Sequence, residues 1–487
     1  MSKVKIKKEK VEILPFEKIK TPFWKVDDLK EITTMAIPIF IQLLFNILIS
    51  QINLIAINHY RHGVYSEAVA KAVLSYNTLQ FIPSLIATGT IVVAGNLIGQ
   101  GRKEEVSKVV VTGLLINFVI SAFIFATIET LSDQIVHLMN ADNLRVIKEG
   151  DVVLENSELR FVSSYYRILN VNILTLSLSQ VFVAGLQSMK KSTYVTIGTV
   201  IANVIDLILV SVLLYGTKLN PIWSALTIPI TGVFQIIYMM FMCFKFIDFK
   251  VNRGKQLNWI YAKETLKTGL PITIEMGVWN LCNFGTGVAI AKLGGTGAED
   301  DNPWIVLHRN ANSIGQYSTA FIQAMGTVTS VFVARKIGED DRQGAYETAI
   351  NCWKAAIYAT LLANILMLAL SYPLLELLGS QGKSWPWGVG MLSIYAVKIL
   401  FDTVNMTLLR ALWSAGDLWY PILVSFVTMG IGMVALPFVV IYGFDLLGGW
   451  GLMAIYAVLS VDPISRSIIY VIRWIGGKWQ KYMHIIK

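Results

Sequence analysis

Long apolar runs, separated by short polar segments, make up most of the chain. Each run is long enough to cross a bilayer, because a helix rises about 1.5 Å per residue and the hydrocarbon core is roughly 30 Å thick. The runs cover approximately residues 32–58, 68–98, 106–129, 160–186, 192–215, 221–246, 266–292, 310–334, 344–371, 387–413, 418–442 and 448–472. This pattern predicts an all-α integral membrane protein with twelve transmembrane helices.

Similar stretches recur in the two halves of the chain. Ala36–Gln42 reads AIPIFIQ and Gly269–Glu275 reads GLPITIE, so proline, isoleucine and a polar residue one turn later are repeated in register. Three further matches follow in the same order: 95–105 with 334–345, 185–194 with 411–420, and 213–216 with 440–443. Because each half has an even number of spans, the repeat is parallel and gives two pseudo-symmetric lobes of six helices.

Composition agrees with a membrane protein. Hydrophobic residues make up 54% of the 487 residues and charged residues 15%, whereas a soluble domain carries about 25% charged residues. The net charge of +9 could indicate nucleic acid. The positive residues lie in short segments between the spans, however, so the lipid bilayer is the expected partner, without nucleic acid. Three scattered cysteines and five histidines without ligand spacing argue against a metal site.

Lys and Arg residues are concentrated on the side of the N-terminal tail. The positive-inside rule therefore predicts a multi-pass protein of the cell membrane with both termini cytoplasmic. The expected divisions are a basic tail at 1–30, an N-lobe at 31–247, a cytoplasmic linker at 248–265, a C-lobe at 266–476 and a C-terminal tail at 477–487. The basic tail is expected to be solvated or to lie on anionic lipid.

Ionisable residues within the spans are the candidate functional groups, since a charge at membrane depth costs about 2.5–3.5 kcal/mol on insertion scales. Glu275 follows Pro271 by one turn and is a candidate site for a cation or proton; a protonated carboxyl bonded to helix backbone is the alternative. Asp402 and Lys398 are four residues apart and share a helix face. They predict a carboxylate that lysine holds until a cation displaces it, or else a fixed structural pair.

Asp206 lies near the middle of the fifth span. It is a candidate proton site, with Asn53 beside it if the two helices face each other; a protonated acid bonded to a neighbouring helix is the alternative. Uncharged polar residues within spans, including Gln42, Asn280 and Asn283, fit an aqueous cleft or hydrogen bonds between helices. The sequence has no convincing set of nucleophile, base and acid, so a secondary active transporter is expected rather than an enzyme.

Several segments resemble motifs of the multidrug and toxic compound extrusion (MATE) family. Tyr165–Ile168 resembles its Tyr-x-Arg-Ile motif, residues 337–345 resemble the end of its eighth helix, and 410–421 resemble its Arg-Gly-x-Gly-Asp-x-x-x-Pro turn. The resemblance covers roughly residues 30 to 470. It implies twelve helices in two lobes around a central cleft, and a monomer that exports bulky, often cationic drugs against inward flow of Na⁺ or H⁺. It implies no cofactor other than this ion.

The sequence departs from the family pattern at the expected coupling sites. Asn53 stands where many members have an acid, and Asp206 stands where they have an asparagine. Trp279 occupies the position of a seventh-helix glutamate, and Asp402 lies three residues after the position of a tenth-helix aspartate. These shifts leave the ion open between Na⁺ and H⁺.

Two other functions remain as alternatives. A flippase or exporter of lipid-linked sugar or polysaccharide precursors would need a basic cleft. A membrane-embedded enzyme would need clustered catalytic groups.

Overall fold

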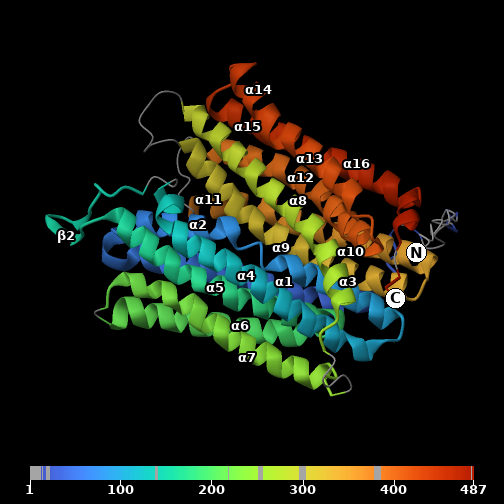
Figure 1. Cartoon of the computed structure of the whole chain (residues 1–487). Helices are drawn as coiled ribbons and strands as arrows, with labels where there is room; N and C mark the ends of the chain where they lie inside the picture. Colours follow the sequence, from blue (N-terminus) through green and yellow to red (C-terminus); the bar gives the residue numbers. More distant parts are fainter. Residues whose placement is uncertain are drawn as a thin grey trace, which may run out of the picture. The chain divides into compact units, whose positions relative to one another are not determined.

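The computed structural model describes residues 13, 15–17, 22, 24–137, 141–217, 219–250, 256–294, 303–377, 385–483 and 485–486. Helices dominate this part of the chain, and its strands form one antiparallel hairpin, β1 (Ile147–Glu149) with β2 (Val152–Glu155) (Figure 1). Nine described helices are long and apolar enough to span a membrane: Leu29–Ile57, Lys103–His137, Glu158–Ser188, Ser192–Gly216, Pro221–Phe246, Arg342–Ala369, Pro386–Ala415, Trp419–Tyr442 and Gly448–Ile475. The expected all-α membrane fold is confirmed.

Three of the twelve expected spans are absent from those nine. The second is divided into α2 (Ser66–Leu79) and α3 (Ser84–Gly99) at Pro83, which cannot donate a helix hydrogen bond. Asn117 donates its side-chain amide to the Pro83 carbonyl oxygen at 2.9 Å, which satisfies a backbone acceptor at the break. The seventh and eighth spans are the continuous helices α8 (Trp259–Ala291) and α9 (Pro303–Gly338).

The chain forms two compact units. The first, here called the N-terminal unit, comprises Thr33–Asn280. It contains most of α1 (Leu29–His59), then α2, α3, α4 (Val106–His137), α5 (Glu158–Ser188), α6 (Ser192–Ser211) and α7 (Thr227–Phe246). Helix α5 is its central element, since it packs against α2, α3, α4 and α7. Serine and asparagine recur among the buried residues of α5, which also include Gly185, and the small side chains allow this close packing.

The C-terminal unit comprises residues 1–32 together with Leu281–Lys487. Its helices are α9, α10 (Arg342–Ala369), α11 (Ser371–Leu377), α12 (Trp385–Ala415), α13 (Trp419–Met429), α14 (Leu436–Tyr442), α15 (Gly448–Leu459) and α16 (Val461–Ile475). Helix α12 is central here and packs against α9, α10, α15 and α16. The fourth and tenth spans therefore hold equivalent places, as the sequence repeat predicts.

Helix α8 is shared by the two units, because the boundary falls between Asn280 and Leu281. In its first part, Gly269 lies against the backbone of Leu85, where an added Cβ would be 2.3 Å from the carbonyl oxygen. In its second part, Thr286 donates to the carbonyl oxygen of Met433 at 2.7 Å. The sequence instead predicts a lobe boundary in the linker 248–265, and this division into lobes stays a prediction. Small residues let the start of α8 pack closely in the N-terminal unit.

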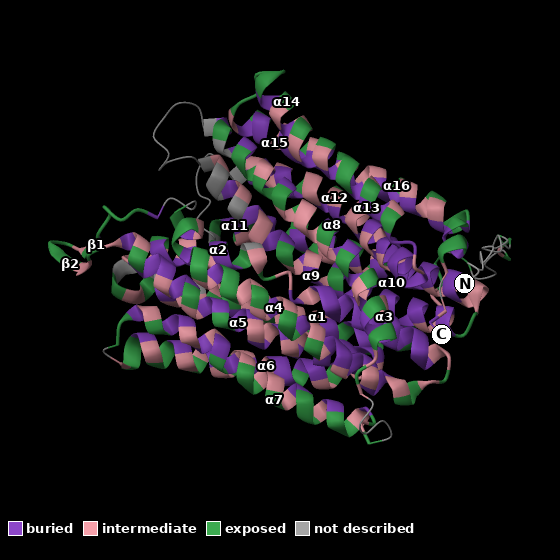
Figure 2. Ribbon diagram, viewed as in Figure 1, coloured by how far each residue is buried: buried purple, intermediate pink, exposed green. Residues whose placement is uncertain are grey.

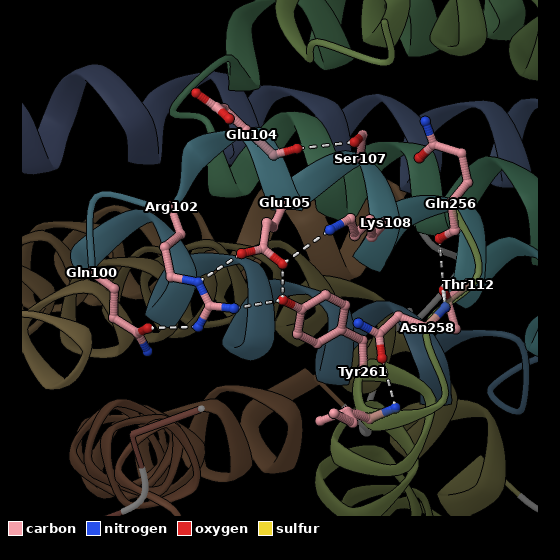
Figure 3. A network of polar contacts seen from close by, with 11 residues as sticks. Gln100, Arg102, Glu104, Glu105, Ser107, Lys108, Thr112, Gln256, Asn258 and Tyr261 are labelled. Carbon is pink, nitrogen blue, oxygen red and sulfur yellow. Dashed lines mark hydrogen bonds and ion pairs between the residues drawn. The ribbon is translucent and has the colours of Figure 1, made fainter. Parts of the chain in front are cut away.

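A network of polar contacts fixes the start of α8 to the turn between α3 and α4 (Figure 3). Arg102 donates to Glu105 at 2.8 Å and to the Tyr261 hydroxyl at 2.9 Å. The Tyr261 hydroxyl in turn donates to the second oxygen of Glu105. Nearby, the backbone N–H of Asn258 donates to the Thr112 hydroxyl at 3.1 Å. The network explains how the beginning of the seventh span is held within the N-terminal unit.

Part of the N-terminal segment packs against the C-terminal unit. The Phe16 ring stacks on Tyr346 with 4.2 Å between ring centroids. The Gln343 side chain accepts the Glu17 N–H at 3.2 Å and donates to the Glu17 carbonyl at 3.3 Å. Lys354 donates to the carbonyl oxygen of Pro22 at 3.3 Å. These contacts correct the expectation of a solvated or lipid-bound tail for the described residues among 1–30.

Exposed residues occur along several helices (Figure 2), and many of them are large and apolar. Examples are Phe123 on α4, Phe241 on α7, Leu362 on α10 and Ile472 on α16. Exposed apolar surface of this kind suits contact with lipid rather than water.

Candidate functional site

Helices α1 and α6 meet along a row of polar contacts within the N-terminal unit. Asn53 donates its side-chain amide to Asp206 Oδ2 at 2.7 Å. One turn earlier on α6, Asn203 donates to Asn46 Oδ1 at 2.9 Å. The sequence analysis expected Asn53 beside Asp206 if these helices faced each other, and the structure brings the two residues together. Their role in ion coupling stays a prediction.

Both groups of this pair have an oxygen available for a ligand. Asp206 Oδ1 and Asn53 Oδ1 are buried and have no hydrogen-bond partner among the described residues. The Asp206 residue is only 5% exposed, and Thr227 on α7 lies within interaction range of its carboxyl group. Buried polar oxygens normally have a partner. A carboxylate oxygen beside an amide oxygen suits a proton or a small hard cation.

The charged pair expected on the tenth span is present in the C-terminal unit. Lys398 donates to Asp402 Oδ2 at 2.5 Å, and the two side chains are 22% and 25% exposed. The Lys398 ammonium also lies 5.4 Å from the centre of the Tyr395 ring, one turn earlier on α12. The ammonium thus compensates the charge of Asp402, and the aromatic ring offers a surface for a cation.

A second charged pair, on α16, was missed by the sequence analysis. Arg466 donates to Asp462 Oδ2 at 2.5 Å, and their side chains are 6% and 4% exposed. Ser467 donates to the Phe401 carbonyl oxygen at 2.6 Å, which brings α16 against α12 beside Asp402. The available signal was the spacing itself: opposite charges four residues apart in the final apolar run, like Lys398 and Asp402.

The remaining candidates lie on α1 and α8. Glu275 and Gln42 are both buried, and both belong to the N-terminal unit. Glu275 was expected in the C-lobe, so its place differs from the one that the repeat suggested. Asn280 donates to the Met276 carbonyl oxygen of its own helix at 3.0 Å, whereas the sequence suggested an aqueous cleft or a hydrogen bond between helices. Asn283 is exposed and lies in the C-terminal unit.

The turn between α12 and α13 explains one motif of the sequence. Asp417 is buried there and accepts two hydrogen bonds from the Arg473 guanidinium, at 2.7 Å and 3.0 Å. Burial raises the pKa of Asp417, and the bonds from Arg473 oppose that shift. Gly416, before it, has φ of +93°, a left-handed conformation that favours glycine. These residues therefore have a structural role at the end of α12.

Known proteins similar to this chain are transporters. The MatE family model matches residues 38–212 and 308–438. The uncharacterized transporter YisQ of Bacillus subtilis is 24% identical over 454 residues, which cover 91% of this chain and 93% of that protein. The probable multidrug resistance protein NorM of Thermotoga maritima is 21% identical over 465 residues, covering 93% of each.

The fold agrees with solved structures of such transporters. A MOP superfamily transporter from Pyrococcus furiosus superposes with a TM-score of 0.81 at 14% identity, covering 96% of this chain and 99% of that one. That protein is described as having a binding pocket of reverse polarity that suggests a different function. The matched segments and the shared fold define a class, multi-pass membrane transporters of small molecules. Within this class, the chain belongs to the MatE family.

Proposed function

We propose that this protein is a secondary active transporter that exports bulky, cationic small molecules in exchange for Na⁺ or H⁺. The observation that carries the proposal is the pair of Asp206 and Asn53, in which two buried oxygens have no hydrogen-bond partner among the described residues. At membrane depth, a carboxylate whose partner is neutral is strongly stabilised when it binds a proton or a cation. Occupation of Asp206 would therefore depend on the ion supplied from either side.

The second part of the proposed site is Asp402 with Lys398. A cationic substrate or ion that binds Asp402 has to displace the lysine, so this carboxylate is available only to a competing cation. Glu275 is a third carboxyl group for the exchange, and Gln42, Asn280 and Asn283 would supply neutral polar contacts. Alternating access would then present these groups to one side of the membrane at a time.

The proposal also covers the oligomeric state, the location and the orientation of the transporter. It acts as a monomer in the cell membrane with both termini in the cytoplasm, without a catalytic reaction, a cofactor or nucleic acid. The relative NorM, a probable multidrug resistance protein, supports the substrate class. The alternative, a flippase for lipid-linked sugar precursors, predicts unpaired basic groups in the cavity. Lys398 and Arg466 instead each hold a carboxylate.

The test is transport of tetraphenylphosphonium into proteoliposomes under Na⁺ and H⁺ gradients imposed separately. The intact protein should accumulate the cation under at least one gradient. Asp206→Asn should abolish gradient-driven accumulation, because the amide cannot exchange a proton and binds a cation poorly. The matched control is Glu376→Gln, an exposed acid on α11. Full gradient-driven transport by Asp206→Asn would refute the role of Asp206, and no accumulation under either gradient would refute cation antiport.

A further inference from the structure

The buried pair Asp462 and Arg466 has no role in the function proposed above. Both side chains are almost fully buried within the C-terminal unit, and their charged atoms are 2.5 Å apart. Burying two charges is costly, and hydrophobic residues of similar size often stabilise a fold better. In a membrane-spanning helix, such a pair usually marks a functional path.

Asp462 lies at nearly the same depth as Lys398. Helices α12 and α16 run in the same direction, because one span, α13–α14, lies between them and reverses the chain. The bond from Ser467 to Phe401 fixes their register. Lys398 precedes Phe401 by three residues and Asp462 precedes Ser467 by five, so their levels differ by about 3 Å along the helix axes. The flexible lysine stem can cover such an offset along the helix axis.

One carboxylate oxygen of Asp462 can accept a further hydrogen bond. Its Oδ2 accepts the bond from Arg466, whereas Oδ1 is buried and has no hydrogen-bond partner among the described residues. The backbone of α16 at this residue is held by close packing against Gly432, where an added Cβ would be 2.9 Å from Asp462 Cβ. Gly432 belongs to the π-helical turn Gly430–Ala435, a local feature that is frequent at functional sites. Asp462 is thus a fixed carboxylate with one unfilled acceptor.

We propose that Asp462 is a positioning residue that receives Lys398 when a cation occupies Asp402. This inference rests on the proposed role of Asp402 in binding a cation. A cation that binds Asp402 releases the ammonium at membrane depth, where an uncompensated charge is unfavourable. Transfer of Lys398 to Asp462 Oδ1 keeps the ammonium paired, and the bond from Arg466 holds the Asp462 carboxylate in place. The ligand class at Asp402 is a monovalent cation, inorganic or organic, which Lys398 replaces in the empty state.

A double-mutant cycle tests the transfer through binding of tetraphenylphosphonium to the purified full-length protein. Lys398→Met should bind the cation more tightly than the unmodified protein, because the tethered competitor is gone. Asp462→Asn should weaken binding about tenfold when Lys398 is present and by less than about twofold in the Lys398→Met background. An equal loss in both backgrounds would overturn the proposal, since a purely structural role of Asp462 does not depend on Lys398.

Two further variants separate a failure of the proposed transfer from misfolding and from a failure of the proposed function. Asp462→Asn combined with Arg466→Gln removes both buried charges, so it leaves no uncompensated guanidinium and guards against misfolding. It should show the same dependence on Lys398; equal losses with and without Lys398 would again overturn the proposal. Asp402→Asn tests the proposed function itself, because it should lose tetraphenylphosphonium binding. If Asp402→Asn bound the cation like the unmodified protein, the cation site at Asp402 would be wrong, and the transfer of Lys398 with it.

Discussion

The buried carboxylates of this protein differ in the partner that each one has. Asp206 is bonded to a neutral amide, Asn53, and has an oxygen without a hydrogen-bond partner among the described residues. Asp402 and Asp462 are each bonded to a cationic side chain of their own helix. An external proton or cation stabilises a carboxylate that has a neutral partner more than one that is already paired with a basic side chain. The dependence on the coupling ion is therefore expected at Asp206.

Asn53 is expected to adjust the ion affinity of the site, whereas Asp206 is expected to bind the ion. Asn53→Ala removes a hydrogen bond to the Asp206 carboxylate, and such a bond to a charged group contributes about 1.5–3 kcal/mol. We expect gradient-driven transport to persist with a shifted ion requirement. Na⁺ should bind several-fold more weakly, because the Asn53 amide oxygen is lost, whereas H⁺ should bind more tightly, because the ionised carboxylate loses a hydrogen bond. The concentration of Na⁺ or H⁺ that gives half-maximal tetraphenylphosphonium transport measures this shift. The matched control is Asn203→Ala, which removes a similar amide bond one turn away, to Asn46. An equal shift in both variants would contradict a specific role of Asn53.

At the scale of elements, the start of α8 is anchored by the Tyr261 network (Figure 3). Tyr261→Phe removes a hydroxyl that accepts from Arg102 and donates to Glu105. We expect a loss of about 1–3 kcal/mol in stability, because both bonds involve a charged group. Thermal unfolding in detergent measures it, with the exposed Tyr442 changed to Phe as a control. Equal unfolding temperatures of the two variants would contradict an anchoring role for the hydroxyl.

The N-terminal segment forms a second anchor, on α10. Phe16→Ala removes the ring that stacks on Tyr346 and Trp479. We expect this segment to become accessible to protease, and the protein to lose about 0.5–1.5 kcal/mol beyond the lost apolar contact. Limited proteolysis followed by mass spectrometry measures the change. Protection equal to that of the unmodified protein would show that stacking of Phe16 is not needed to hold the segment.

Elements differed in how far the sequence could predict them. Apolar length was enough for most spans, and the four-residue spacing was enough for Lys398 and Asp402, since contacts within one helix are local. The bond between Tyr261 and Glu105 joins residues 156 positions apart, and no periodicity indicates it. The sequence also could not show that Glu275 lies in the N-terminal unit. The repeat marks equivalent positions in the two halves, but it does not show against which unit the first part of α8 packs.

At the scale of the whole molecule, the repeat produces two units with equivalent central helices but unlike chemistry. Helices α5 and α12 hold corresponding places. The N-terminal unit carries Asp206 with an amide, and the C-terminal unit carries two acids with their own bases. The sequence predicted the repeat and two of these acids, Asp206 and Asp402. Asp462 was missed, although its four-residue spacing from Arg466 is the same as that of Lys398 and Asp402.

The central claim is that binding of the ion at Asp206 and binding of the cationic cargo exclude each other. The most direct measurement is the release of bound ion when tetraphenylphosphonium is added to the purified protein. Released protons are followed with a pH-sensitive dye in weak buffer, and released Na⁺ is followed with radioactive sodium. The unmodified protein should release one of the two ions as the cation binds, and Asp206→Asn should release none. Binding of the cation without release of either ion would contradict the account.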